Sequence, residues 1–551
     1  MARQSVEKVL ARSKAAWKIK DNWRALKTDA YSLALPARNP YHGNVDGHDY
    51  STPGQPKMDK VFDSTLMLST IRFANRLQSD LTPPFTKWGS LVPGPFVPEQ
   101  AKEELKIILS DMTTKAFAAI HASNFDTAIN EFYLELAIGT GDMMISDGND
   151  QRPVRFTAVP NSQIAHEEGP WGEIWGWFRR HKLPLRNIEA TWPGKVKLPA
   201  EFATDLKDNP DKLVTLEEAT YFEPDDNRYY YDVIIGSSEG RDRKAKAAGE
   251  RIVEESFEES PWVTARWIKL ANEVEGRGPV LFALPDAKTL NKLKELVLKN
   301  ASLAISGVWL GRDDGVLNPN TIKISPGTVI QVASTGGTMG PSLVPLPFEG
   351  RFDVSQLVAA ELIANIKAIM LDDALPDEAG PVRSATEFIF RQRKLQADVG
   401  SPFGRLMSEL IRPTFQKVLN VLAKRGLIQV EQGQRVKIDG VFVNIELASP
   451  LAQAQNLSEV ETAANWMGMI KAMGDEAFML GVKVEDMPEW FGEKMSVDPR
   501  LIRPKDERGA LQKMAGLLAA RQMQAAQAQG GQQTPVGVGG GGATIGLAEA
   551  A

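Results

Sequence analysis

The sequence has no cysteine among its 551 residues. A disulfide framework, a cysteine-ligated zinc site and a thiol nucleophile are therefore excluded, and packing must supply the stability. No run of about 18 apolar residues is present that would span a bilayer. The start, Met1 to Ser5, lacks the apolar segment of a secretion signal. We therefore expect a soluble chain.

Motifs for nucleotide binding and catalysis are missing as well. There is no G-x-x-x-x-G-K-[ST] loop, so the phosphate cradle of a P-loop ATPase is absent. Gly276-Arg-Gly278 has two glycines of a dinucleotide fingerprint but lacks the third, and we interpret it as a turn. The five histidines include no H-E-x-x-H pair and are scattered: His42, His48, His121, His166 and His181. We expect no enzyme activity, no metal and no cofactor.

Composition indicates a globular chain with several domains. Hydrophobic residues make up 43% of the sequence, enough for a substantial core, and the length fits three or four units of about 150 residues each. The formal net charge is −6. A protein that neutralises many DNA phosphates needs a concentrated basic face, so this charge argues against tight phosphate binding.

Two helical patterns separated by a break are the most informative feature. Asp353 is a candidate N-cap for the first, which carries apolar residues at helical spacing and is expected to stop at Leu371. These apolar residues are Leu357, Val358, Leu362, Ile366 and Ile369. The second pattern starts at Ser384-Ala-Thr-Glu387, a capping box, and we expect Gly400-Ser-Pro402 and Pro413 to kink it.

The break itself is rich in proline, glycine and carboxylates. Two prolines and a glycine in residues 374–383 forbid a continuous helix. Asp372 and Asp373 stand at the C-terminus of the first helix, where the macrodipole disfavours negative charge by roughly 0.3–1 kcal/mol each. Something other than local helix stability is therefore expected to keep them there.

This unit resembles the tunnel-loop region of bacteriophage portal proteins, the head-to-tail connectors of podovirus-type phages. Further motifs in the family's order extend the resemblance along most of the chain. They are Val61-Phe-Asp-Ser-Thr65, Leu81-Thr-Pro-Pro84 with Trp88, Ser123-Asn-Phe125, Gly139-Thr-Gly141, Pro261-Trp262, Arg266-Trp267, Gly276-Arg-Gly-Pro279, Leu284-Pro-Asp286 with Asn291, and Ser384 to Glu387 with Arg391. Gly89 after Trp88 departs from the pattern, since an aromatic is expected there.

The resemblance implies an α+β, multi-domain portal fold with long helices and small β-rich modules that assembles into a ring. Short β-like runs with turn signals in residues 173–257 fit such a module, with a hairpin turn at 223–227. Sequence patterns also predict one helix around 15–26, another over 58–80, an N-cap at Asp286, and strands at 321–324, 328–332 and 441–445. The expected organisation is an N-terminal wing region at 1–172, clip and adjoining stem segment at 173–275, stem helix at 276–310, wing β region at 311–352, helix, tunnel loop (374–383) and long kinked helix at 353–425, crown region at 426–510, and Ala/Gln-rich helix with a Gly-rich flexible tail at 511–551.

The resemblance also implies a structural function. A ring, as a dodecamer in the family, would form the channel at one capsid vertex through which double-stranded DNA is packaged and later ejected without sequence-specific binding. The implied partners are the major capsid protein, the terminase large subunit, tail or adaptor proteins, and a scaffold protein during assembly. The implied location is the virion, after assembly in the host cytoplasm. A neutral or acidic channel wall would let double-stranded DNA slide past. The net charge alone does not indicate such a wall, because most cytosolic proteins are mildly acidic.

Site residues follow from position in the family. Asp377, Glu378 and Arg383 would line the tunnel, and Lys288, Lys292 and Lys299 on the stem helix would meet phosphates, although an exposed amphipathic helix looks the same. Arg241, Arg243 and Lys244 belong to a basic run that is either a clip docking patch or a solvated loop.

Two other functions stay open. Asp372 and Asp373 could belong to a metal-dependent nuclease of a packaging system, which would use paired carboxylates to hold metal ions. A scaffold or internal virion protein without a channel is the third hypothesis.

Overall fold

The computed structural model describes residues 3–41, 58–236, 249–306, 309–311, 343–345, 352–372, 402–428, 438, 443–447, 450–474, 478, 480–483 and 486–495. The chain divides into two compact units, Met1–Ala452 and Gln453–Ala551. This division lies inside the expected crown region at 426–510. Among the described residues, no helix is long and apolar enough to cross a membrane.

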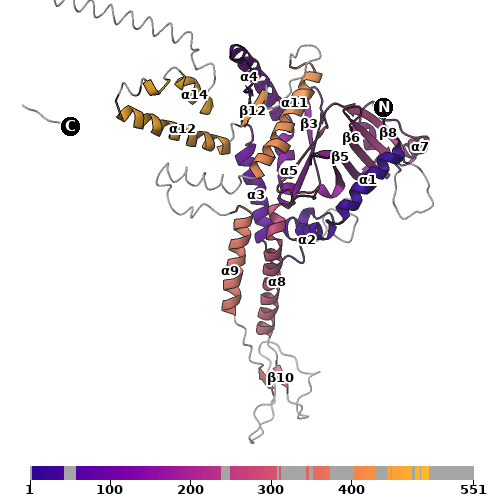
Figure 1. Cartoon of the computed structure of the whole chain (residues 1–551). Coiled ribbons are helices and arrows are strands. Elements are labelled where there is room, and N and C mark those ends of the chain that lie inside the picture. The colour runs from indigo at the N-terminus through magenta and orange to yellow at the C-terminus, as the bar shows by residue number, and fades with distance from the viewer. Residues whose placement is uncertain are drawn as a thin grey trace, which may run out of the picture. The chain divides into compact units, whose positions relative to one another are not determined.

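Helices and strands alternate along the first unit (Figure 1), and the chain has the expected α+β class. The helices are α1 (Val6–Asp21), α2 (Arg24–Ala34), η1 (Pro36–Arg38), α3 (Thr65–Leu81), α4 (Glu99–Ala122), α5 (Phe125–Ile138), η2 (Asn161–Gln163), α6 (Leu185–Thr191), α7 (Ala200–Asp208), α8 (Pro279–Ser306), α9 (Phe352–Ile369), η3 (Met407–Ile411), α11 (Arg412–Lys424), α12 (Pro450–Ala472) and α14 (Met487–Lys494). The strands are β1 (Gly89–Pro93), β2 (Thr140–Asp147), β3 (Val154–Val159), β4 (Ile164–Glu168), β5 (Ile174–Pro184), β6 (Leu213–Glu223), β7 (Arg228–Ile235), β8 (Glu250–Phe257), β9 (Trp262–Arg266), β10 (Trp309–Gly311), β11 (Leu343–Pro345) and β12 (Val443–Leu447).

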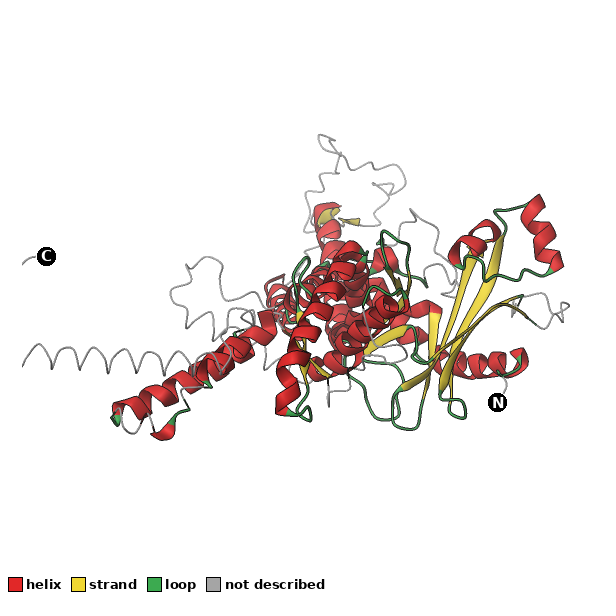
Figure 2. Cartoon of the chain, turned by 90° about the horizontal axis from the view of Figure 1, so that it is seen from above, coloured by secondary structure: helices red, strands yellow, loops and turns green. Residues whose placement is uncertain are grey.

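A five-stranded antiparallel sheet, β4-β5-β6-β7-β8, forms a three-layer module. Side chains of β7 alternate between its two faces, as a strand buried on both sides requires. Tyr231 and Val233 pack with α6, whereas Ile234 packs with Trp17 of α1 (Figure 2). The hairpin expected at residues 223–227 is confirmed. Because β4 pairs with β5, the expected boundary at 172/173 falls inside a β-hairpin.

The main core joins α2, α3, α4, α5, the base of α8 and α11 with the sheet β3-β2-β9. Trp88 lies at its centre and contacts Phe117, Phe125 and Phe415 at ring-centroid distances of 5.1, 5.9 and 5.4 Å. Gly89 pairs with Leu447 of β12, where an added Cβ would meet only ordinary contacts. The expected strand at 441–445 is thus found as β12.

Helices α8 and α9 pack along each other and extend from this core (Figure 1). With 28 residues, α8 spans about 42 Å at 1.5 Å per residue. β10 and β11 pair antiparallel at the far end of the two helices. The expected N-cap at Asp286 is wrong, because α8 starts at Pro279 and Pro285 lies inside it. Burial of Val280, Leu284 and neighbouring side chains outweighs the hydrogen bond that proline removes.

Two expectations for the N-terminal helices need correction. The single helix expected around residues 15–26 is broken between Asp21 and Arg24 into α1 and α2. The helix expected over 58–80 starts at Thr65, and Leu68 and Ile71 are 47% and 42% exposed. The buried stripe instead follows Leu66, Phe73 and Leu77, which share one face of α3 at helical spacing.

The long helix after the expected tunnel loop is interrupted, as expected, next to Pro413. Residues 402–406 are helical, Met407–Ile411 form a π-helix, and α11 follows with the proline in its first turn. Proline donates no backbone hydrogen bond, and the first turn of a helix tolerates this. Single π-turns of this kind are rare and frequently lie at functional sites.

Several expected elements lie outside the described residues. They are the strands at 321–324 and 328–332, the tunnel loop at 374–383, the capping box Ser384 to Glu387, and the Ala/Gln-rich helix and Gly-rich tail at 511–551. Of the second unit, the structure describes most of α12 and α14, which are joined by a 2.6 Å ion pair between Lys494 and Glu459.

Candidate functional site

Sequence motifs that lie far apart in the chain meet where α8 leaves the core. Asn291 of α8 accepts hydrogen bonds from the backbone nitrogens of Phe62 (2.7 Å) and Asp63 (3.1 Å), and donates to the Lys60 carbonyl (2.9 Å). Lys294 forms an ion pair with Asp63. Asp63 also accepts from the nitrogen of Thr65, the first residue of α3, at 2.8 Å. The Phe-Asp-Ser-Thr motif therefore fastens α3 to α8.

Glycines permit a second contact between motifs, at the beginning of α8. An added Cβ at Gly139 would lie 2.1 Å from the Gly276 carbonyl oxygen, and one at Gly278 would lie 2.1 Å from that of Ala137. The Gly278 nitrogen donates to the Ile138 carbonyl (2.9 Å) and the Gly276 nitrogen to the Thr140 hydroxyl (2.8 Å). The backbone before α8 therefore lies directly on the end of α5, which no side chain would allow.

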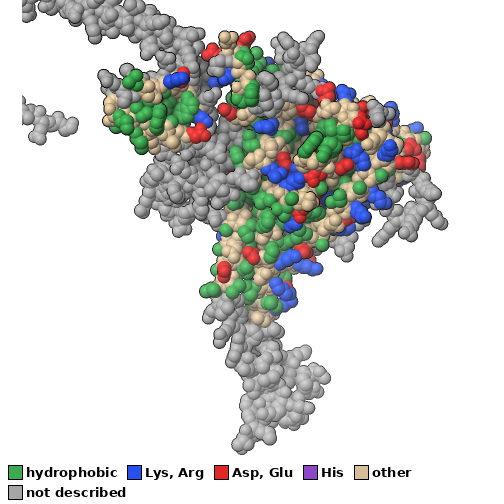
Figure 3. All heavy atoms as spheres, in the orientation of Figure 1, with side chains coloured by type: hydrophobic (Ala, Val, Ile, Leu, Met, Phe, Trp, Pro, Cys, Tyr) green, Lys and Arg blue, Asp and Glu red, His purple; other side chains and the backbone are tan. Residues whose placement is uncertain are grey.

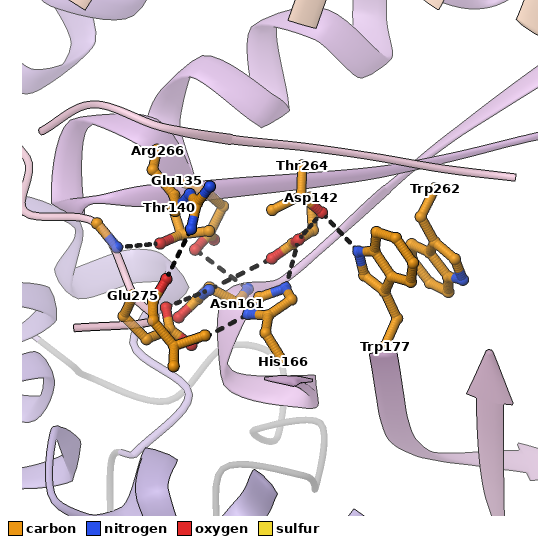
Figure 4. Close-up of polar contacts among 12 residues, drawn as sticks. Glu135, Thr140, Asp142, Asn161, His166, Trp177, Trp262, Thr264, Arg266 and Glu275 are labelled. Atoms are coloured by element: carbon orange, nitrogen blue, oxygen red, sulfur yellow. Dashed lines mark hydrogen bonds and ion pairs between the residues drawn. The ribbon is translucent and has the colours of Figure 1, made fainter. Parts of the chain in front are cut away.

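A buried ion cluster lies beside this contact (Figure 4). We use this name for six residues that are each at most 5% exposed: Lys20, Lys27, Asp142, Asn161, His166 and Glu275. Glu275 binds Lys20 and Lys27, each at 3.0 Å. These residues come from α1, α2, β2, η2, β4 and the segment before α8. The cluster therefore ties the five-stranded module, the core and the beginning of α8 together.

His166 lies between two carboxylates. Its Nε2 is 2.8 Å from Asp142 and its Nδ1 is 3.2 Å from Glu275. A carboxylate accepts, so both ring nitrogens act as donors and the geometry fits the imidazolium. Burial alone would lower the pKa of His166, but the two carboxylates raise it above its usual value. Asp142 also accepts from the Thr264 hydroxyl at 2.6 Å.

Burial and charge act in opposite directions on the other members. Burial lowers the pKa of Lys20 to about 8, although Glu275 opposes this. For Glu275, burial would raise the pKa, but Lys20 and Lys27 hold it well below the usual range. Asn161 bridges the charges, since its amide nitrogen is 3.3 Å from both Asp142 and Glu275. Lys20 and Glu275 therefore each favour the charged form of the other.

The cluster has the geometry of a structural tie. Its donors and acceptors bind one another, and among the described residues no group of three or more His, Asp or Glu is placed to hold a metal ion. Removing one member of such a network leaves an uncompensated buried charge. The resulting loss of stability is larger than the stability that the intact network adds relative to apolar side chains of the same size. We infer that it fixes the base of α8 against the module.

Replacing His166 by glutamine is expected to change how stability depends on pH. The raised pKa means that the imidazolium contributes fully below the unfolded pKa of about 6.5, and that this contribution is lost as pH rises through the folded value. The urea midpoints of wild type and His166→Gln should therefore converge as the pH rises above about 6.5. A difference that stays constant as the pH rises from this value would contradict the assignment.

The expected stem lysines differ in their surroundings. Lys288 pairs with Asp29 of α2 at the base of the helix. Lys292 and Lys299 are 62% and 64% exposed and bind Glu295 of the same helix at 2.9 and 2.5 Å. Lys and Arg atoms lie along the α8 side of the two helices (Figure 3). The lysines therefore share one helix but only two of them share an acidic partner.

The remaining expected site residues lie outside the described part of the chain: Asp377, Glu378, Arg383, Arg241, Arg243 and Lys244. Asp372 is described, and its carboxylate binds Ser69 at 2.6 Å and Arg72 at 3.3 Å. The carboxylate oxygens of Asp372 therefore accept hydrogen bonds from side chains of α3. Asp373, the other carboxylate of the nuclease hypothesis, is outside the described residues.

Comparison with known proteins gives the family. The family described as bacteriophage head to tail connecting protein matches residues 6–502. The probable portal protein of Bordetella phage BPP-1 is 22% identical over an alignment of 498 positions, which covers 86% of this chain and 84% of that protein.

Solved structures with similarity come from gene transfer agent particles. A chain of the native virion is 12% identical in sequence, and the match covers 79% of this chain and 92% of that chain with a TM-score of 0.35. A chain of the neck of the empty particle is 11% identical, and the match covers 78% of this chain and 94% of that chain with a TM-score of 0.34. The family match alone spans most of the sequence, and it agrees with the motifs that meet at α8. The chain therefore belongs to the family of bacteriophage head-to-tail connecting proteins.

Proposed function

We propose that copies of this chain close into a ring, a dodecamer by resemblance, that forms the DNA channel at one capsid vertex. The observation that carries the proposal is the family match over residues 6–502. A ring needs a heterologous interface whose rotation closes. Double-stranded DNA would pass through this ring during packaging and ejection, and the ring itself would catalyse no reaction.

We assign α8 and α9 to the stem of that channel. The two helices extend from the main core (Figure 1). Asn291 and the glycine contact hold the base of α8, and Asp372 after α9 binds Ser69 of α3. As part of this proposal, the end of the pair that carries β10 and β11 belongs to the clip. The resemblance implies the clip and adjoining stem for residues 173–275. Because the strands β5 to β8 pack between α1 and α6, we propose the wing as the alternative assignment for this module.

Partners follow from this arrangement. We propose that the clip meets the terminase large subunit and later tail or adaptor proteins, and that the body contacts the major capsid protein and, during assembly in the host cytoplasm, a scaffold protein. Arg241, Arg243 and Lys244 connect β7 to β8 in the sequence and stay a proposed docking patch. The assembled ring would be part of the virion.

We propose that helix α8 and the tunnel loop at 374–383 both contribute to the tunnel wall. Lys292 and Lys299 are exposed on α8, and Glu295 between them lowers their net attraction for phosphate. Such a wall touches DNA without holding it. Asp377, Glu378 and Arg383 are assigned to the lumen by their position in the family, with Lys288 nearer the base.

Glycine substitutions across residues 375–382 test the function of the tunnel loop. We expect rings to assemble as in wild type while DNA packaging or retention falls, because the loop loses the Asp377 and Glu378 carboxylates and its backbone becomes more flexible. The readouts are ring yield by native mass spectrometry and packaged DNA per particle.

A control carries glycine at Asp211, which pairs with Arg186 on the surface of the module. It should package normally. Wild-type packaging by the 375–382 variants would remove the loop from the mechanism.

A further inference from the structure

The described part of the chain stops at Asp372 and resumes at Pro402. Close to each of these residues in the sequence, a carboxylate binds residues of the first unit. We call these contacts the Asp372 anchor (Asp372 with Ser69 and Arg72) and the Glu409 anchor (Glu409 with Arg266 and Arg405). Neither is part of the buried ion cluster.

The Asp372 anchor follows an unusual helix end. The Leu371 nitrogen donates to the Ala368 carbonyl (3.2 Å) and the Asp372 nitrogen to that of Lys367 (2.8 Å), which is the Schellman arrangement. Leu371 has φ of +56°, where glycine or asparagine is usual. A leucine in this conformation is strained, so the surrounding structure must hold it.

Side chains of α3 supply that support. Ser69 donates to the Asp372 carboxylate at 2.6 Å, Arg72 lies 3.3 Å from it, and Arg76 donates to the Leu371 carbonyl. The Asp372 side chain is 9% exposed, whereas that of Arg72 is 61% exposed. These hydrogen bonds are charge-assisted. They explain why the Asp372 carboxylate is stable at a helix C-terminus, where the helix macrodipole disfavours negative charge.

The Glu409 anchor lies in the π-helix η3. The Glu409 carboxylate accepts from the backbone nitrogen of Arg266 (2.9 Å) and from its guanidinium (2.7 Å), and Arg405 adds a bond of 3.0 Å. Arg266 is 4% exposed and also donates to the Gly172 carbonyl at 3.0 Å. A π-turn contains one extra residue relative to an α-helix, so it sets which side chains face β9.

Both anchors thus pair an unfavourable backbone feature with a carboxylate that binds the body. We propose that Asp372 and Glu409 are positioning residues that fix the two points where residues 373–401 join the body. The inference rests on the proposed function, because that segment includes the proposed DNA-facing loop. Fixed ends would keep the loop at a constant place in the channel wall while DNA moves.

Isosteric substitutions test the anchors in the assembled ring. Asp372→Asn and Glu409→Gln keep side-chain size and remove the charge. We expect unchanged ring yield, an amide hydrogen-exchange rate about tenfold higher at residues 370–372 or 402–411 respectively, and a loss of packaged or retained DNA. Glu361→Gln on α9 is the matched control, since Glu361 has no ion pair within the described part of the chain and no such change is expected there.

A disulfide gives a rescue test, because the chain has no cysteine of its own. Ser69→Cys with Asp372→Cys replaces the hydrogen-bonded pair by two thiols. Oxidised rings should package as wild type does, and reduced rings should resemble Asp372→Asn. Oxidised rings that fail while reduced rings package would overturn the inference, because the segment would then need to leave its anchor.

The outcomes separate this inference from the proposed function. If the 375–382 glycine variants package normally, the tunnel-loop function fails whatever the anchors do. If those variants fail to package while Asp372→Asn and Glu409→Gln package and exchange like wild type, the inference about the anchors alone is overturned.

Discussion

Gly278→Ala is expected to prevent the first unit from folding correctly. The added Cβ would lie 2.1 Å from the Ala137 carbonyl oxygen and 2.6 Å from the carbonyl carbons of Ala137 and Ile138. All three are backbone atoms, so no side chain can move aside, and either the segment before α8 or the end of α5 must shift. We expect a loss of about 3 kcal/mol or more, seen as little soluble protein and no rings.

The matched control for this prediction is Gly404→Ala. Gly404 is helical, has no neighbouring atom within 4 Å of an added Cβ, and lies in the helix before η3. Alanine there should be neutral or raise stability by up to about 1 kcal/mol. Normal folding and ring assembly of Gly278→Ala would show that the close contact between α5 and the segment before α8 is not needed.

The second large effect is expected for Glu275→Gln. This change keeps the shape of the side chain and removes the charge that holds Lys20, Lys27 and His166 together. Within the buried ion cluster, three cationic groups would then have Asp142 as their carboxylate. We expect a loss of about 3–5 kcal/mol in the free energy of unfolding, measured by urea denaturation.

Glu273→Gln is the control for the buried position. Glu273 pairs with Arg277 at 2.6 Å, and both side chains are partly exposed, at 25% and 31%. A pair of this kind contributes about 0–1 kcal/mol. If both variants lose the same small amount, the buried ion cluster does not hold the base of α8.

Local sequence patterns predicted those parts of the fold that local physics decides. The apolar spacing predicted α9, and the turn signal at 223–227 predicted the β6–β7 hairpin. Pro413 predicted the interruption before α11. The motifs also indicated the family correctly. The carboxylate at Asp372 was a useful signal, because a residue that violates a local rule is often held by a distant partner.

The rest depended on contacts that no local pattern carries. Pro285 predicted a helix boundary, but burial of the apolar residues before it extended α8 to Pro279. Lys20, His166 and Glu275 come together although more than a hundred residues separate each from the next. Their sequence neighbourhoods look like ordinary surface segments. The glycines at 276 and 278 mark the place, but their pattern in the sequence indicates only a turn.

The most direct test of the account is the mass and shape of the purified full-length chain, by native mass spectrometry and negative-stain imaging of the same sample. A closed ring with a central hole, of about twelve copies by resemblance, is the predicted result. A compact dimer or a monomer without a hole, under conditions in which the chain is folded, would contradict the channel.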